Sequence, residues 1–560
     1  MCQSMMPPRL FMLILLVAFT FGTSAADTAN SAREEIAPKV AAARAILDPW
    51  LATNPEPGQR KLHLVLWTPR DREPAPRYRE RLSDIFKDIQ GFYASEMERL
   101  GFGPRTIGLD IASDGLVRIH LVHGLKDYAD YDVRSGDAIR NECLPVLEAV
   151  GLKPEEETIV IFCNMSNWDA EKRTISQNSP YYASGTHRNG TAWQVDSPIL
   201  DLALLTDKGN NVRDGQYGNV SLGRYNSIFI GGACHELGHA LGLPHNRERS
   251  DEGEAFGTAL MGSGNRTYGE QLRGESKGSF LTLAHGLRLA SHPMFSGSIK
   301  GMRLRPSARP SDIAVRQKGK GFEFSGKVSG EPPVYAVVGY LDPEGGSDYD
   351  ATTTTAVPDK EGRFTLDCQA LAAGKKGLLR VVYLQANGVA SGFLSATPYR
   401  YPYVVAADGT ADISATLAAL ASKDLIKEEK PGAGPAATGE SDPAALLKQL
   451  IGTEWQLQDL CGETVITNSR ASLAFAADGA ISGIGSINRF NGRITVEEKT
   501  LKVGPLAATK MAGPPAAMAQ ESKYLKALQS ATAIQVEGNS LTIACADSRK
   551  PLTFTKITRP

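Results

Sequence analysis

Three histidines and a glutamate stand close together in the segment HELGHALGLPH at residues 235–245. On an α-helix, residues i and i+4 lie about 40° apart on one face, so His235 and His239 can point at a single ion. Glu236 follows the first histidine and can reach a water beside the metal without binding the metal itself. The segment therefore predicts one catalytic Zn2+ with His235, His239 and His245 as its ligands. Glu236 is then the catalytic residue.

A glycine and a proline determine where the helix of this segment ends. Gly242 lies where the chain must leave the helix, in a backbone conformation that is costly for residues with a Cβ. Pro244 prevents the helix from resuming. The resulting turn would bring His245 back toward the first two histidines as the third ligand. The alternative is a chance match on a helix whose histidines only pack or lie at the surface; because five positions of the longer pattern are fixed at once, we expect the metal site.

The pattern H-E-x-x-H-x-x-G-x-x-H resembles that of the metzincin clan of zinc metallopeptidases. This clan adds a methionine-containing turn beneath the metal, and the segment GTALMGSG at residues 257–264 is its candidate here. The resemblance implies that Met261 forms an apolar floor under the histidines and has a structural role. The residue after the third histidine, Asn246, matches none of the best-known signatures of the clan, so the subfamily stays open.

The same resemblance implies a reaction and a substrate class. A zinc-activated water would attack the scissile carbonyl of a protein or peptide substrate, while Glu236 takes its proton and then passes one to the leaving amine. We therefore expect a secreted zinc-dependent endopeptidase. The main alternative is a catalytically inactive zinc-bearing envelope or extracellular binding protein, and Glu236 argues against it because loss of the general base is the simplest inactivating change. A zinc hydrolase of a non-peptide bond and a purely structural envelope protein are weaker alternatives.

The first residues predict a secretory signal peptide over residues 1–26. Arg9 provides a short basic region, residues 10–19 are apolar, and residues 23–26 are the small residues that signal peptidase requires. No later segment approaches the twenty apolar residues of a transmembrane helix. We therefore expect export to an extracellular or periplasmic location, without a transmembrane segment after signal removal. An uncleaved membrane anchor is the alternative.

Composition excludes some functions and leaves the cysteines open. Lys plus Arg (61) nearly balances Asp plus Glu (62), and no basic stripe stands out, so nucleic-acid binding gains no support. Six cysteines remain after residue 26, which is too few for a disulfide scaffold. Cys143 with Cys163, and Cys461 with Cys545, are plausible pairs within their domains, and free thiols are the alternative.

The pattern of apolar residues predicts a multidomain chain that begins with an α/β domain of the metzincin type over residues 27–300. Helical spacing predicts an amphipathic helix over residues 77–100 that packs on a sheet. Apolar runs predict strands at residues 61–67, 116–122 and 158–163. The polar stretch with Tyr181, Tyr182 and Trp193 is expected to be a surface loop, and the border of a substrate cleft is the alternative.

A second domain is predicted after the glycine and prolines near residue 305. Short alternating segments at residues 321–328, 334–340, 362–366 and 378–385 predict an all-β, sandwich-like middle domain over residues 305–405. Residues 406–444 are expected to hold a short apolar helix followed by a flexible linker rich in Lys, Glu, Gly, Ala and Pro.

The last segment, residues 445–560, resembles the META domain, also called HslJ-like, a small β-rich domain of bacterial envelope proteins. The resemblance rests on GTEWQL at residues 452–457, FAADGAISG at 475–483, NRFNG at 488–492 and GPLAATKMA at 504–512. It implies a bacterial source and an association with the cell envelope through this domain, and it implies no chemistry. The family usually places cysteines where this chain has Ile487 and Gly513, so any bridge that the family forms there is absent.

Overall fold

The computed structural model describes residues 30, 32–345, 349–391, 399–422, 450, 452–466, 471–476, 479–497, 500–504, 506–509, 514–537, 540–545 and 550–557. The predicted signal peptide and flexible linker lie outside these residues. The chain forms two compact units, residues 1–426 and 427–560. Within the described residues, no helix combines the length and the apolar composition needed to cross a membrane.

The centre of the first unit is a five-stranded sheet in the order β2-β1-β3-β7-β6, with β6 antiparallel to its neighbour and the other pairs parallel. Its strands are β1 (Leu62–Thr68), β2 (Ile119–His123), β3 (Thr158–Cys163), β6 (Tyr182–Gly185) and β7 (Gly190–Val195). All residues of β1 and β3 are buried, as expected for parallel strands covered on both faces. The three predicted strands are thus confirmed, with β2 beginning three residues later than expected.

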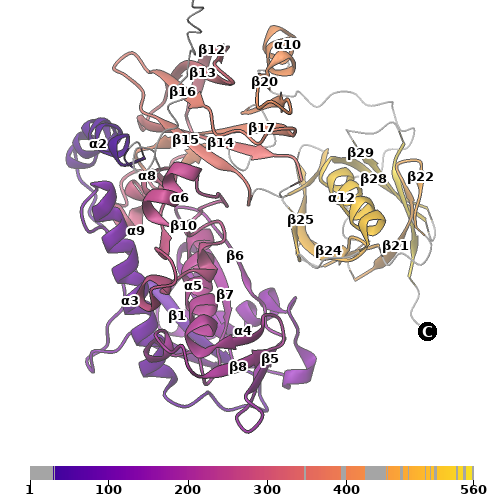
Figure 1. Cartoon of the computed structure of the whole chain (residues 1–560). Helices are drawn as coiled ribbons and strands as arrows, with labels where there is room; N and C mark the ends of the chain where they lie inside the picture. Colours follow the sequence, from indigo (N-terminus) through magenta and orange to yellow (C-terminus); the bar gives the residue numbers. More distant parts are fainter. Residues whose placement is uncertain are drawn as a thin grey trace, which may run out of the picture. The chain divides into compact units, whose positions relative to one another are not determined.

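Helices cover both faces of this sheet (Figure 1). Alternate side chains of a strand point to opposite faces. Leu64 and Leu66 belong to the large core that also contains the buried face of α3 (Tyr78–Leu100), whereas Val65 and Trp67 belong to a second core with α4 (Gly136–Ala149). The predicted amphipathic helix over residues 77–100 is confirmed. The domain therefore has three layers, with the sheet in the middle.

Further α-helices and two small sheets complete this part of the unit. The α-helices are α2 (Ile36–Ala52), α5 (Leu222–Ala240), α6 (Ser250–Phe256), α7 (Glu270–Arg273), α8 (Leu283–Ala290) and α9 (Pro293–Ser296). A four-stranded sheet in the order β4-β5-β8-β9 is built from β4 (Ser166–Asp169), β5 (Thr174–Gln177), β8 (Asn211–Asp214) and β9 (Gly218–Ser221). The pair β10 (Thr258–Ala259) and β11 (Ser279–Phe280) is parallel. Neither the four-stranded sheet nor this pair was predicted from the sequence.

The β-rich middle region consists of two sheets that share one core. The first sheet contains β12 (Arg309–Lys318), β13 (Gly321–Ser329) and β16 (Arg363–Cys368). The second contains β14 (Val334–Pro343), β15 (Thr352–Ala356), β17 (Lys376–Gln385), β18 (Ala390–Ser391), β19 (Arg400–Val405) and β20 (Ala411–Asp412). Phe324 and Leu366 of the first sheet and Val337 and Val381 of the second are buried in the same cluster. The four predicted strands are confirmed, and α10 (Ser414–Ser422) follows as the predicted short helix.

The middle region packs directly on the α/β region that precedes it. Tyr335, Val338 and Tyr340 of β14 belong to the same apolar core as the sheet and α8. The hydroxyl of Tyr335 donates to the backbone carbonyl of Leu287 on α8. Since a continuous apolar core crosses the junction near residue 305, the two regions form one compact unit.

The second unit is a strongly curved antiparallel sheet in the order β26-β25-β24-β23-β21-β30-β29-β28, and β26 lies beside β28. Its strands are β21 (Glu454–Leu460), β22 (Glu463–Thr464), β23 (Ser472–Phe475), β24 (Ala480–Ile484), β25 (Arg489–Glu497), β26 (Thr500–Val503), β27 (Ala507–Ala508), β28 (Ala531–Glu537), β29 (Ser540–Cys545) and β30 (Leu552–Lys556). Helix α12 (Pro515–Gln529) lies within the curve of the sheet (Figure 1) and contributes Tyr524 and Leu528 to its core. The unit is therefore a nearly closed β-barrel.

The cysteines of the described residues are free thiols. Cys143 and Cys163 lie in one core cluster, and Cys461 packs against the core that contains Cys545. Each suggested pair is thus close in space without a disulfide bond.

Candidate metal centre

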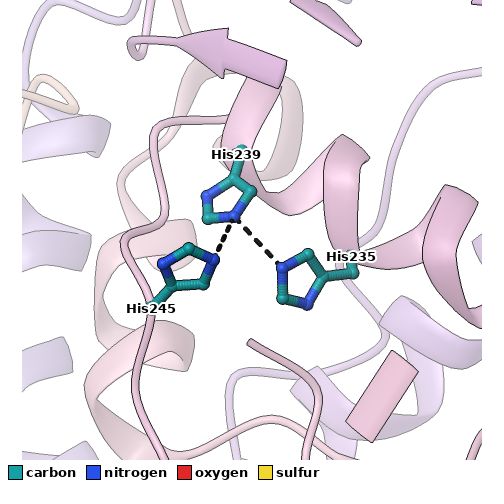
Figure 2. A group of neighbouring side chains, drawn as sticks. All are labelled: His235, His239 and His245. Atoms are coloured by element: carbon teal, nitrogen blue, oxygen red, sulfur yellow. Dashed lines mark hydrogen bonds between the residues drawn. The ribbon is translucent and has the colours of Figure 1, made fainter. Parts of the chain in front are cut away.

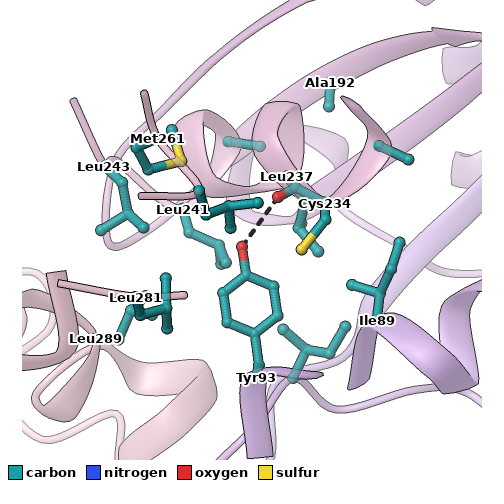
Figure 3. Close-up of a cluster of buried hydrophobic side chains, with 14 of the residues drawn as sticks. Ile89, Tyr93, Ala192, Cys234, Leu237, Leu241, Leu243, Met261, Leu281 and Leu289 are labelled. Carbon is teal, nitrogen blue, oxygen red and sulfur yellow. Dashed lines mark hydrogen bonds between the residues drawn. The ribbon is translucent and has the colours of Figure 1, made fainter. Parts of the chain in front are cut away.

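The first two histidines of the motif lie on α5, a helix that is buried along most of its length. The helix starts at Ser221, whose hydroxyl accepts a hydrogen bond from the backbone N–H of Arg224 at 3.1 Å. Farther along, the hydroxyl of Tyr93 on α3 donates to the carbonyl of Cys234 at 3.0 Å (Figure 3). A helix buried on most sides and tied to α3 in this way holds its side chains in fixed positions.

The end of α5 turns the chain back as the sequence suggests. Gly242 has a φ of 83°, and its N–H donates to the carbonyl of His239 at 2.9 Å. The N–H of Leu243 donates to the carbonyl of Gly238, also at 2.9 Å. These two bonds form a Schellman motif, in which the left-handed position favours glycine. The chain then reverses and brings His245 opposite the last turn of the helix.

The three histidine side chains converge on one point (Figure 2). The Nε2 atom of His239 lies 3.1 Å from Nε2 of His235 and 2.9 Å from Nε2 of His245. The other ring nitrogens of the two helical histidines face backbone carbonyls: Nδ1 of His235 donates to Leu260 at 2.7 Å, and Nδ1 of His239 donates to Leu243 at 2.8 Å. Because a carbonyl oxygen can only accept, each of these imidazoles carries its proton on Nδ1 when neutral.

This arrangement fits a bound cation. A neutral imidazole protonated on Nδ1 has a lone pair at Nε2 and cannot donate from it, so the Nε2 atoms of His235 and His239, 3.1 Å apart, repel each other unless a positive charge lies between them. Ligands about 2.0–2.1 Å from a tetrahedral zinc would be about 3.3 Å apart, close to the observed spacing. Among the described residues, these three histidines form the one group of His, Cys, Asp or Glu with metal-binding spacing. The three histidines can therefore hold a metal ion.

Met261 packs beneath this group. Its side chain is fully buried, and a Cβ added to Gly238 would lie 2.4 Å from its sulfur, so the methionine contacts α5 between His235 and His239 (Figure 3). The preceding residue, Leu260, provides the carbonyl that holds His235. One segment therefore supplies both an apolar floor and a hydrogen-bond acceptor.

Glu236 lies on α5 next to the first histidine, with 9% of its surface exposed. Tyr181 packs against the same helix: a Cβ added to Gly232, one turn before Glu236, would lie 1.5 Å from the Tyr181 hydroxyl oxygen. Burial raises the pKa of Tyr181 well above its usual range, and the nearby charge of Glu236 raises it further. This phenol therefore stays protonated beside the carboxylate.

The stretch around Tyr182 and Trp193 is not a surface loop, and that expectation was wrong. These residues lie opposite each other on the antiparallel strands β6 and β7, and Trp193 is buried. Cβ atoms added to Gly185 or Gly190 would lie 1.9 and 2.0 Å from the carbonyl oxygen of Ala240. The hairpin therefore packs tightly against the end of α5, and β6 forms the edge of the sheet beside the histidines.

A residue from the middle region also reaches this centre. The ring of Tyr349 stacks on the imidazole of His245, with centroids 3.5 Å apart and 25° between the planes. Its centroid is 6.3 Å from that of His235. Sequence reasoning missed Tyr349 because it belongs to a different region of the chain and is preceded by no motif. It also missed the carbonyls of Leu260 and Leu243, since backbone acceptors carry no signal in the residue types.

Comparison with solved structures gives a match over more than half of the chain. Catalytically inactive OgpA from Akkermansia muciniphila, in complex with an O-glycopeptide (glycodrosocin) substrate, matches with a TM-score of 0.52 and 26% sequence identity over 62% of this chain and 94% of that chain. Wild-type OgpA from the same organism matches with a TM-score of 0.51 and 27% identity over the same shares of the two chains.

The C-terminal part has a family match of its own. Residues 448–558 match the META domain family. No curated protein matches the chain. Both resemblances found in the sequence are thus confirmed: the larger part of the chain is similar to OgpA and carries three histidines that could hold a metal ion, and residues 448–558 form a META domain.

Proposed function

We propose that this protein is an exported zinc endopeptidase that hydrolyses peptide bonds in O-glycosylated peptides or proteins. The observation that carries the proposal is the convergence of three histidine Nε2 atoms, with Glu236 on the same helix as two of these histidines. Imidazole ligands suit zinc, and a three-histidine site leaves room for water and substrate. The similarity to OgpA supports a peptidase, and the O-glycopeptide bound to that protein suggests the substrate class.

In this proposal, the ligands are held ready by the backbone. His235 and His239 keep their protons on Nδ1 through the carbonyls of Leu260 and Leu243, so Nε2 remains available for the metal. When bound, zinc would supply a Lewis acid that polarises a carbonyl and makes water nucleophilic at neutral pH. The Glu236 carboxylate takes a proton from the attacking water and passes a proton to the nitrogen of the leaving amine.

We further propose that the substrate lies in an extended conformation along β6. This strand is the edge of the central sheet, is four residues long and runs antiparallel to β7. An exposed edge offers unpaired backbone groups to an added strand. The close contact between Gly185 of β6 and Ala240 of α5 places that edge beside the metal ligands.

We also propose, from the N-terminal sequence, that the protein is exported. A signal peptide over residues 1–26 would direct the chain to a periplasmic or extracellular location in a bacterium. The META domain would associate the enzyme with the cell envelope. Secretion can be tested by comparing the N-terminus of the protein in the cell pellet with that in the medium after expression of the full chain.

The hydrolytic proposal is tested with one peptide in two forms, with and without an O-glycan on a threonine. Zinc-loaded wild type should cleave the glycosylated form, and Glu236→Gln should cleave neither form while retaining its zinc. Cleavage of the unglycosylated form alone would preserve the peptidase and overturn the substrate class. No cleavage of either form, or of a peptide library, by zinc-loaded wild type would overturn the function itself.

A further inference from the structure

The third metal ligand is positioned differently from the other two. His235 and His239 lie on a buried helix, whereas His245 lies in the loop that follows the Schellman turn. A side chain on a loop depends on its neighbours for its orientation. The neighbours of His245 are therefore part of what determines the geometry of the metal centre.

A segment of the middle region lies along the chain that follows His245. The backbone N–H of Arg247 donates to the carbonyl of Ala351 at 2.8 Å, and the guanidinium of Arg249 donates to the carbonyl of Thr353 at 3.3 Å. Arg247 also forms an ion pair with Asp350 at 3.7 Å, which is largely exposed and contributes little. These contacts fix residues 349–353 next to residues 245–249.

Tyr349 begins this segment, and its ring covers the face of the His245 imidazole. The two planes are 25° from parallel and their centroids are 3.5 Å apart, so the ring contacts the whole face of the imidazole. Flat contact of this kind limits rotation of the imidazole about its side-chain bonds. The Nε2 atom of His245 is thereby kept toward Nε2 of His239, 2.9 Å away.

We infer that Tyr349 is a positioning residue for the third metal ligand and that the middle region is therefore part of the metal centre. The inference rests on the proposed metal site and extends it, since the β-rich region that follows the motif at residues 235–245 then contributes to the affinity of that motif for the metal. Residues that orient a ligand typically change metal affinity about 10- to 100-fold when they are removed. A ring that orients a ligand only by packing belongs at the lower end of that range.

The test measures zinc affinity in the full chain, by competition with a chromophoric chelator. Tyr349→Ala should weaken zinc binding about tenfold, and Tyr349→Leu, which keeps apolar bulk without a flat ring, should weaken it by a similar factor. Tyr349→Phe keeps the ring and should bind zinc as wild type does. Tyr399→Ala removes a tyrosine of the same region that packs on Tyr383, and it serves as the matched control with wild-type affinity expected.

The outcomes separate this inference from the proposed function. Wild-type zinc affinity in both Tyr349→Ala and Tyr349→Leu would overturn it, and so would a Tyr349→Phe variant as weak as Tyr349→Ala. Unfolding of the metal-free variants by urea shows whether each has folded, and Tyr349→Leu provides the test if Tyr349→Ala has not. Since zinc affinity is measured without substrate, a wild type that binds zinc and cleaves nothing would overturn the peptidase proposal and leave this inference intact.

Discussion

Gly190→Ala should destabilise the first unit and loosen the metal site. A Cβ at this position would lie 2.0 Å from the carbonyl oxygen and 2.7 Å from the carbonyl carbon of Ala240, both of which are backbone atoms. To restore an ordinary van der Waals distance between these atoms, the β6–β7 hairpin and the end of α5 must separate by more than about 1 Å. Overpacking of this kind costs about 1–3 kcal/mol, and the upper end is expected here because no side chain can move aside.

The same displacement reaches a ligand, because Ala240 directly follows His239. Metal–ligand distances tolerate only about 0.2 Å, so zinc affinity should fall together with stability. The matched control is Gly91→Ala on α3, where an added Cβ meets nothing within 4 Å. That change should stabilise the protein by up to about 1 kcal/mol, because alanine has a higher helix propensity than glycine.

Urea denaturation of the metal-free full chain, followed by tryptophan fluorescence, measures the stability of both variants. Zinc affinity is measured separately by competition with a chromophoric chelator. Four of the five tryptophans (Trp50, Trp67, Trp168 and Trp193) lie in the first unit, so the signal reports mainly on that unit. The midpoint should fall for Gly190→Ala and rise slightly for Gly91→Ala. An unchanged midpoint and unchanged zinc affinity in Gly190→Ala would refute the tight packing of the β6–β7 hairpin on α5.

Three further predictions concern the site and its surroundings. Glu236→Gln should retain zinc and a wild-type melting temperature, while its rate of peptide hydrolysis falls about 10²–10⁴-fold. Metal analysis, calorimetry and mass spectrometry of the products measure these three properties, and a variant as active as wild type would remove Glu236 from the mechanism. Met261→Ala should cost about 2–5 kcal/mol in urea unfolding because the side chain is fully buried against α5, whereas Met261→Leu should cost less than about 1.5 kcal/mol. Burial lowers the pKa of His292 to about 3, so the folded protein keeps this imidazole neutral while the unfolded chain gains a proton below about pH 6.5. The contribution of the neutral His292 to stability is therefore fully present above about pH 6.5, and the free energy of unfolding should fall by up to about 1.4 kcal/mol per pH unit from there toward pH 3. His292→Asn keeps an acceptor for the N–H of Met294 and should make this pH dependence shallower.

The long apolar elements of the fold could be predicted from the sequence, and the short polar ones could not. The runs at residues 61–67 and 158–163 are strands because parallel strands buried on both faces are apolar throughout. The strands of the four-stranded sheet are four residues each and carry polar side chains, as in β4 (Ser166–Asp169), so neither length nor alternation distinguishes them from loops. The order of strands in the central sheet likewise cannot be predicted from local sequence patterns.

The candidate site likewise has a part that the sequence predicts and a part that it does not. The histidines at 235, 239 and 245 are local in sequence, and helix periodicity with one glycine turn is enough to predict their convergence. The carbonyls of Leu260 and Leu243 and the ring of Tyr349 come from tertiary contacts. The packing of the middle region on residues 245–249 was also missed, because a boundary marked by glycine and prolines indicates a change of fold and says nothing about the contacts across it.

Metal analysis of the purified chain, prepared without chelators, tests the central claim most directly. Wild type and Glu236→Gln should each contain one zinc per chain, and the single variants His235→Ala, His239→Ala and His245→Ala should contain far less. Circular dichroism of each variant checks that the fold is retained. Zinc-free wild type that also takes up none when zinc is supplied would contradict the account, as would a histidine variant that binds zinc as tightly as wild type.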